Sequence, residues 1–345
     1  EGFFDKHGEP IIEDPASPVE TLDGDTMSIG ARSFLKNERD SVKHDAREMN
    51  EIIRQFPFNT DEAFRDSVEG SLFNIGKIYE QIEHNEYMYP NPVVRGNFQW
   101  RGGVKDTTVF FNPDSNGRWY VCWMPEESER SVMKDERGRR VAPHPTVGCG
   151  GVDSYDLDTT VDSRASKGAC HIYNKFNMSG ASNMFVAEYA SRPPMASIFY
   201  EDVLMAAVFY GYPLLIENNK YGIVRYFESR GYDGYVMDRP EHLKVGTSSS
   251  RTKGIPSNSK DVIQSHASAI EDYIHNYVGL DEEGSPGRMY FNRTLEDWIG
   301  FKIDNRTKFD LSISSGLALL AAQKVKPKKK KKKFEESVFF RRYKA

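Results

Sequence analysis

Cysteine is scarce in this sequence, and its spacing supports neither a metal site nor a disulfide framework. The 345 residues contain three cysteines, Cys122, Cys149 and Cys170, which lie far apart and form no Cys-x-x-Cys pair. Structural zinc sites and disulfide-stabilised folds both need closely patterned cysteines. The sequence therefore predicts neither, and it fits a protein of a reducing cytoplasm.

Long hydrophobic runs and internal repeats are also missing. No apolar run is long enough to span a bilayer, and the first residues show no signal-peptide pattern. At this length the chain can bury a large core and form more than one folding unit. It opens on Glu1 rather than Met, so we expect it to be part of a longer protein.

A phosphate-binding loop for ATP is absent from the sequence. The pattern Gly-x-x-x-x-Gly-Lys-Ser/Thr does not occur. The segment from Gly70 to Lys77 comes nearest, but its two glycines are one residue too far apart and Ile78 follows the lysine. We therefore expect no ATPase site in this chain.

Positive charge is concentrated at the C-terminal end. The formal net charge is −5, yet residues 324–344 hold the unbroken lysine run 328–333 together with five further lysines and arginines. Like charges at successive positions repel, so this run is not expected to pack. A basic tail on an acidic body predicts contact with DNA, which would depend strongly on salt, or with an acidic protein surface.

The second half of the chain predicts an α/β sheet. Short apolar runs bounded by small and polar residues predict strands at 146–153, 169–174, 184–189 and 213–217. Helical spacing predicts helices at 198–210, 223–230, 259–278 and 310–323. Three strands, a helix, a strand and a helix is the order of a ribonuclease H-like α/β fold, with a mixed central sheet flanked by helices.

The first 145 residues predict a helical and β extension of this sheet. Helical spacing predicts one helix over 33–56 and another over 72–86. Aromatic runs at 109–111 and 119–123 flank Asn116-Gly117, which is typical of a β-hairpin.

Acidic residues end two of the predicted strands. Asp153 ends the first strand and Glu217 ends the fourth. If these strands are parallel neighbours joined by a right-handed helical crossover, both acids leave the sheet at the same edge. Asp310 opens the last helix and would be a third acid there. Singly, each acid fits a turn, a surface or a helix cap; the three together favour a site.

Three carboxylates in one cleft predict bound divalent cations. Their mutual repulsion would raise their pKa values unless a cation neutralised the group. Hard oxygen ligands without cysteine suit Mg²⁺ or Mn²⁺. Two such ions would form the clamp that activates a water and stabilises the leaving oxygen in phosphodiester cleavage.

Several segments resemble the nuclease motifs of the large terminase subunits of tailed bacteriophages. Residues 215–222, Leu-Ile-Glu-Asn-Asn-Lys-Tyr-Gly, followed by Arg-Gly-Tyr at 230–232, resemble that family's strand, Glu-x-Asn-x-x-Gly, helix and Gly-Tyr. Residues 151–156 resemble its first nuclease motif, and the segment from Asp310 resembles its last acidic motif. Residues 56–64 resemble the segment that joins its ATPase to its nuclease, and the resemblance covers roughly residues 50–325.

This resemblance implies a function and a set of partners. Such subunits package viral DNA into procapsids and pair an N-terminal ATPase with a C-terminal ribonuclease H-like endonuclease. Position by position, Asp153, Glu217 and Asp310 would be the metal-binding catalytic acids, with Asp156 and Asp158 as further metal ligands. The implied partners are double-stranded DNA, the portal protein, the small terminase subunit and the ATPase domain of the same full-length protein. The expected place of action is the host cytoplasm, with no membrane contact.

The resemblance also divides the chain. We expect residues 1–66 to be the end of the ATPase domain and a linker, 67–145 a helix with a small β subdomain, 146–325 the nuclease domain, and 326–345 a basic tail.

Basic residues near a polar loop are candidates for holding DNA. They would contact phosphates without reading sequence, and they are Lys244, Arg251, Lys253 and Lys260. The alternative for this region is a flexible surface loop. His171 lies in the second strand; we favour a hydrogen-bonded strand histidine over one that faces the site.

Two other classes of function stay open. One is a different ribonuclease H-like enzyme such as an integrase or resolvase, which a strand-transfer assay would reveal. The other is a non-catalytic module that docks on DNA or a portal through its tail. Cleavage with and without EDTA separates that module from a nuclease.

Overall fold

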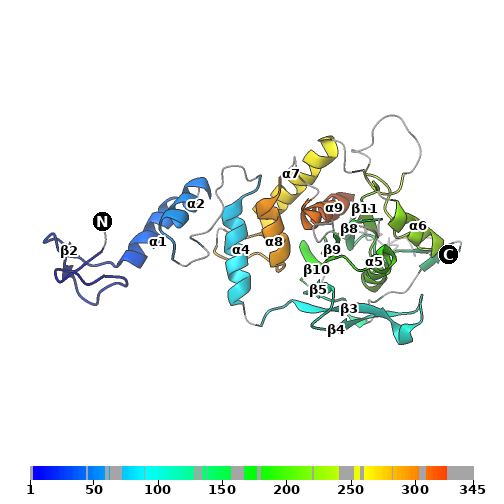
Figure 1. Ribbon diagram of the computed structural model, residues 1–345, viewed down its shortest axis with the longest axis horizontal. Helices are drawn as coiled ribbons and strands as arrows, with labels where there is room; N and C mark the ends of the chain where they lie inside the picture. The colour runs from blue at the N-terminus through cyan, green and yellow to red at the C-terminus, as the bar shows by residue number, and fades with distance from the viewer. Residues whose placement is uncertain are drawn as a thin grey trace, which may run out of the picture.

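The structure, a computed structural model, describes most of the chain. The described residues are 3–43, 46–58, 62, 72–88, 90–127, 130, 134–136, 138–156, 167–176, 180–219, 221–240, 252–256, 260–281, 283–302 and 308–324. Across these ranges no helix has the length and apolar character needed to cross a membrane. The N-terminal elements lie at one end of an elongated molecule and the main sheet toward the other (Figure 1).

A seven-stranded mixed sheet forms the centre of the fold, in the order β11-β8-β9-β10-β5-β3-β4. Its strands are β3 (Val94–Trp100), β4 (Val109–Pro113), β5 (Trp119–Val121), β8 (Gly148–Asp153), β9 (Gly168–Asn174), β10 (Met184–Ser191) and β11 (Leu214–Ile216). Strands β8, β9 and β10 form an antiparallel meander, and β11 pairs in parallel with β8 on its other side. Helix α5 (Ala196–Tyr210) makes the crossover between β10 and β11. This arrangement confirms the predicted ribonuclease H-like α/β order.

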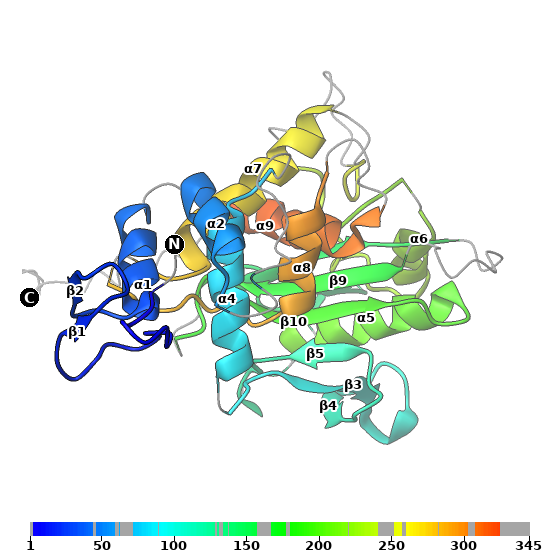
Figure 2. The same ribbon diagram turned by 60° about the vertical axis from the view of Figure 1, so that its left-hand side comes forward.

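Helices cover both faces of the sheet (Figures 1 and 2). Helices α7 (Lys260–Tyr277), α8 (Asn292–Gly300) and α9 (Asp310–Lys324) lie on one face, and α5 and α6 (Gly222–Ser229) lie on the other. Two hydrophobic cores result, one on each side. Because β8 is covered on both faces, all six of its residues are buried. That is why its sequence is continuous and small rather than alternating.

Helix α9 is buried on nearly all sides, between strands β8 and β9 and helices α7 and α8. Its sequence is accordingly apolar and small all round, with no polar face. This burial fixes where the helix begins, and therefore where Asp310 lies.

The N-terminal region holds smaller elements. They are β1 (Val19–Glu20), β2 (Thr26–Met27), α1 (Ala31–Ser41), α2 (Ala46–Gln55) and α4 (Ile75–Tyr87). A further two-stranded sheet is made by β6 (Lys134–Glu136) and β7 (Arg139–Val141). Helix α4 confirms the helix predicted over 72–86, whereas the single helix predicted over 33–56 is wrong. The chain forms two helices there, because α1 ends at Val42, whose backbone is no longer helical.

The hairpin predicted around Asn116-Gly117 is also wrong. Strand β3 lies between β4 and β5 and pairs with both, so the flanking aromatic strands do not pair with each other. The Asn-Gly connection instead crosses β3, where Gly117 packs on Gly96. A Cβ atom on Gly117 would lie 2.3 Å from the Gly96 carbonyl oxygen. The local signal marked a turn correctly but could not specify the partner strand. The strands that we expected in a small β subdomain continue the central sheet.

Candidate functional site

Strands β8 and β11 place two acids side by side. Leu214, Leu215 and Ile216 pair in parallel with residues 150–152. The amide of Glu217 donates to the carbonyl oxygen of Val152 at 2.9 Å, which extends this register to Asp153 and Glu217. Only 4% of Asp153 and 8% of Glu217 is exposed. Two neighbouring carboxylates are therefore held where water screens them poorly.

The same two acids lie on the face of the sheet that α9 covers. Cys149 contacts the Ala318 carbonyl oxygen with its Sγ at 3.4 Å, and Leu215 belongs to the core beneath α9. Side chains two residues apart on a strand share a face. Asp153 and Glu217 each follow these residues at an even spacing, so both lie on the α9 face at the carboxyl ends of their strands.

Helix α9 brings the third acid to this rim. Asp310 is its first residue, and its Oδ2 atom accepts a hydrogen bond of 2.8 Å from the amide of Lys167. Lys167 stands just before β9, and Ala169 two residues later pairs with Asp153. The structure thus gathers the three predicted acids around the ends of β8, β9 and β11.

Gly151 determines how closely α9 approaches the sheet. A Cβ atom there would lie 2.2 Å from both the Ser314 carbonyl oxygen and the Ala318 amide nitrogen. The helix therefore rests directly on the backbone of β8, which only glycine permits. Gly151, the first residue of the nuclease-like motif, therefore has a packing role.

A fourth acid near Asp310 was missed in the sequence. Asp297 of α8 accepts hydrogen bonds from the Ser312 amide at 2.7 Å and the Ser312 hydroxyl at 2.6 Å. Burial, helped by the nearby charge of Asp310, raises the pKa of Asp297 from 3.8 to about 6, although the hydrogen bonds from Ser312 lower it. The helical spacing of Leu295 and Trp298 was the available signal for α8, which we did not predict.

The residues after Glu217 explain why the motif has its form. The Glu217 Oε1 atom accepts from Asn219 Nδ2 at 3.0 Å, and Asn218 Nδ2 donates to the Lys253 carbonyl oxygen at 2.9 Å. Gly222 begins α6, where a Cβ atom would lie 2.5 Å from both Asp156 Oδ1 and the Tyr200 hydroxyl oxygen. The Glu-x-Asn-x-x-Gly pattern therefore orients one acid through Asn219 and permits a close contact at the start of the helix.

Asp156 has structural partners in this arrangement. Its Oδ1 atom accepts from the Tyr200 hydroxyl at 2.7 Å, and its Oδ2 atom accepts from the Gly222 amide at 3.2 Å. Asp156 thereby joins the end of β8 to α5 and α6. Its assignment as a metal ligand stays a prediction, and Asp158 lies outside the described residues.

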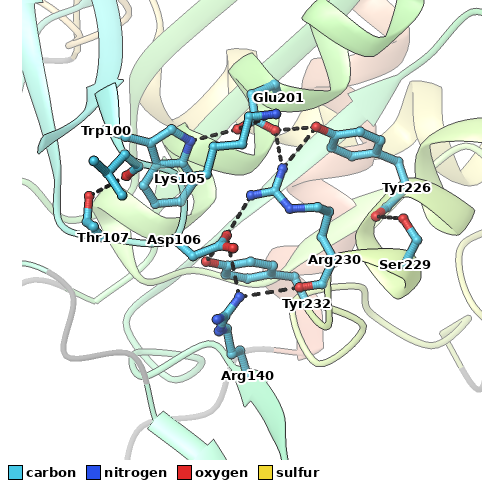
Figure 3. A network of polar contacts seen from close by, with 11 residues as sticks. Trp100, Lys105, Asp106, Thr107, Arg140, Glu201, Tyr226, Ser229, Arg230 and Tyr232 are labelled. Carbon is cyan, nitrogen blue, oxygen red and sulfur yellow. Dashed lines mark hydrogen bonds and ion pairs between the residues drawn. The ribbon is translucent and has the colours of Figure 1, made fainter. Parts of the chain in front are cut away.

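A network of charges behind α6 fixes that helix against α5 and the turn after β3 (Figure 3). Arg230 donates to Glu201 of α5 at 2.6 Å and to Asp106 of the turn at 2.6 Å. Tyr226 donates to Glu201, and Tyr232 donates to Asp106 at 3.0 Å. These contacts hold the pKa values of both carboxyls below their ordinary values, against the opposing effect of burial. The Arg-Gly-Tyr segment at 230–232 thus links the end of α6 to α5 and to the turn after β3.

Of the four candidate DNA-binding residues, Lys253 and Lys260 lie within the described part of the chain. Lys253 donates through Nζ to the carbonyl oxygens of Val236 at 2.7 Å and Asp233 at 3.1 Å, which gives its ammonium a structural role. Lys260 begins α7. Lys244 and Arg251 lie outside the described residues, as does the lysine run 328–333. Their contact with DNA stays a prediction.

Carboxylate oxygens at this rim are chemically suited to Mg²⁺ or Mn²⁺. In the part of the chain that the structure describes, no group of three His, Cys, Asp or Glu side chains lies close enough to hold an ion as positioned. Asp310 instead accepts from a backbone amide. The donor types fit a divalent ion, and the three acids would have to come closer together to share one.

No protein-family model matches the chain, and no curated protein matches it either. Solved structures do resemble it. The large terminase nuclease from thermophilic phage G20c, solved with bound zinc, has 12% identity and a TM-score of 0.34, covering 55% of this chain and 91% of that one. The large terminase nuclease domain of Thermus phage P74-26 has 12% identity and a TM-score of 0.33, covering 55% of this chain and 90% of that one. These neighbours carry the name of the family that the sequence motifs resemble.

Proposed function

We propose that this chain is a divalent-metal-dependent DNA endonuclease, the nuclease part of a viral terminase large subunit. The observation that carries the proposal is the common position of Asp153, Glu217 and Asp310. Asp153 and Glu217 lie side by side at the carboxyl ends of β8 and β11, and Asp310 contacts the amide of Lys167, just before the strand that pairs with β8. Open α/β sheets place their sites at such strand ends. The motif resemblance supports the same function.

In this proposal the protein contributes the metal-binding carboxylates and holds them near one another. Asp153 and Glu217 would hold two Mg²⁺ or Mn²⁺ ions together with Asp310. When bound, such ions lower the pKa of an attacking water and neutralise the leaving 3′ oxygen. Asn219 holds one oxygen of Glu217, and the Lys167 amide holds one oxygen of Asp310. Burial of Asp153 and Glu217 leaves little water to screen their charges, which favours a bound cation.

The biological context follows from the proposed family. The enzyme would cut concatemeric DNA at the start and the end of packaging, in the host cytoplasm at the procapsid. It would act with the portal protein, the small terminase subunit and the ATPase domain of its full-length chain. Sequence readout should be weak, because no base-reading motif is present.

The test is cleavage of a supercoiled plasmid. Purified chain with Mg²⁺ or Mn²⁺ should nick and linearise it, EDTA should stop the reaction, and Asp153→Asn should be inactive while its circular dichroism matches the wild type. Joined DNA products in a strand-transfer assay would point to an integrase. DNA binding without any cleavage, unaffected by EDTA, would point to a docking module and reject the proposal.

A further inference from the structure

A buried chain of hydrogen bonds crosses from α8 through β9 to Ser314, one helical turn into α9. Thr294 contacts His171 Nε2 through its Oγ1 atom at 2.8 Å, and His171 Nδ1 contacts the Ser314 Oγ atom at 2.8 Å. All three side chains are completely buried. At the α8 end, the hydrogen bonds continue to Glu188, whose Oε2 atom accepts from the Thr294 hydroxyl. The Oε1 atom of Glu188 lies 3.5 Å from Nη1 of Arg293.

The residue types resemble a hydrolase charge relay, but the burial excludes that use. A serine nucleophile must reach a substrate. Ser314, His171 and Glu188 are 0%, 0% and 1% exposed, so no substrate can approach them. Burial also lowers the pKa of His171 to about 3, which keeps the ring neutral. This chain of hydrogen bonds therefore has a structural role.

Its position identifies that role. Ser314 lies one helical turn after Asp310, and its hydroxyl is 3.0 Å from the Asp310 carbonyl oxygen. The other two serines of this turn are also held, Ser312 by Asp297 and Ser315 by Trp298. His171 is the contact among these that comes from the sheet. It therefore fixes the start of α9 relative to β9, the strand that follows Lys167.

We infer that His171 is a positioning residue, which holds Ser314 and thereby keeps the Asp310 carboxylate at the acidic rim. The inference rests on the proposed function for its catalytic consequence. Its structural content is independent of that function, because Asp310 contacts the Lys167 amide in the protein without metal. Loss of the His171–Ser314 contact should loosen Asp310 and leave Asp153 and Glu217 in place.

The first test measures structure without activity. In metal-free protein, the Lys167 amide should be protected from hydrogen exchange because it donates to Asp310. Ser314→Ala should accelerate its exchange roughly tenfold or more. The control is Tyr212→Phe, which removes a buried hydrogen bond of 2.8 Å to Asn174 at the opposite end of β9. The control should leave Lys167 exchange unchanged. Equal exchange in Ser314→Ala and the wild type would overturn the inference.

The second test separates the two ring nitrogens. An Asn side chain places a polar atom near the Nδ1 position and can still bond Ser314, whereas Gln reaches toward the Nε2 position and Thr294. We therefore expect His171→Asn to keep more activity than His171→Gln, with Gln losing on the order of 10²-fold in kcat at unchanged KM for DNA. The apparent Mn²⁺ affinity of His171→Gln, measured calorimetrically, should fall by about 10- to 100-fold.

Two outcomes keep the inference separate from the proposed function. If the wild type cleaves no DNA, the proposed function fails, and Lys167 exchange alone still decides the inference. If His171→Asn and His171→Gln lose activity and melting temperature equally, and Tyr212→Phe loses both as well, His171 serves general stability only and the inference fails.

Discussion

Asp153 and Glu217 are neighbours on parallel strands, joined by the 2.9 Å hydrogen bond from the Glu217 amide to the Val152 carbonyl oxygen. Both lie on the face that α9 covers. In the absence of metal, two buried carboxylates at adjacent strand ends repel each other. A divalent ion bound between them would offset this repulsion.

Asp153→Asn should separate activity from stability. We expect cleavage to be abolished, while the metal-free protein stays folded because Asn keeps the shape of the side chain and one of its acceptor oxygens. The increase in melting temperature that Mn²⁺ gives the wild type should be lost. Plasmid cleavage and thermal unfolding with and without Mn²⁺ measure these effects. Wild-type cleavage by this variant would remove Asp153 from the site.

Gly151→Ala should displace α9. The added methyl group would meet backbone atoms of Ser314 and Ala318 at 2.2 Å, and backbone cannot rotate away. We expect a loss of about 3 kcal/mol or more in the free energy of unfolding, above the usual range for overpacking. Gly300→Ala is the matched control, since its nearest atom is the Phe309 ring edge at 3.1 Å. Similar melting temperatures for both variants would contradict the close packing of α9.

The sheet order and the adjacent strand-end positions of Asp153 and Glu217 could be predicted from the sequence. Continuous apolar runs in β8, β9 and β10 announce strands covered on both faces, and the helix before β11 requires a crossover. Once β11 lies parallel to β8, the end positions of Asp153 and Glu217 follow from chain direction. These are consequences of topology, and a single sequence contains them.

Other features depend on partners that local patterns do not specify. The aromatic runs around Asn116-Gly117 predicted a hairpin, but β3 lies between its expected strands. The contact of His171 with Ser314 joins residues far apart in the chain, as does that of Asp297 with Ser312. Such contacts depend on the three-dimensional packing of α8 and α9. No periodicity in the sequence encodes them.

Asp297 should make stability depend on pH. Burial raises its pKa from 3.8 to about 6 in the folded protein, so the folded state binds the proton more tightly than the unfolded state does. Its contribution to stability is therefore fully present below pH 3.8 and is lost as the pH rises through 6. Between pH 4 and pH 8 the wild type should lose about 1–3 kcal/mol relative to Asp297→Asn. Urea unfolding of both proteins across this range measures the difference, and parallel curves would contradict the assignment.

Arg230 should contribute far more to the free energy of unfolding than a surface arginine does. It is 17% exposed and pairs with both Asp106 and Glu201, so Arg230→Met leaves two carboxylates without their main cation (Figure 3). We expect a loss of about 2–4 kcal/mol in the free energy of unfolding. Arg139→Met is the control, because its pair with Asp233 spans 3.3 Å at an arginine that is 65% exposed. That variant should change stability by about 0.5 kcal/mol or less.

The charge of Lys253 should contribute to protein stability, whereas the charge of Lys260 should contribute to DNA binding. The Lys253 ammonium donates to two backbone carbonyl oxygens, so Lys253→Met should cost about 1–2 kcal/mol of stability. It should leave the salt dependence of DNA binding nearly unchanged, because an ammonium held by carbonyl groups neutralises no phosphate. Lys260→Met, at the start of α7, should instead preserve stability and lower the slope of log K against log salt by about 1. Binding isotherms at several salt concentrations decide this. A reduced slope for Lys253→Met with unchanged stability would show that Lys253 leaves its carbonyl partners to contact DNA.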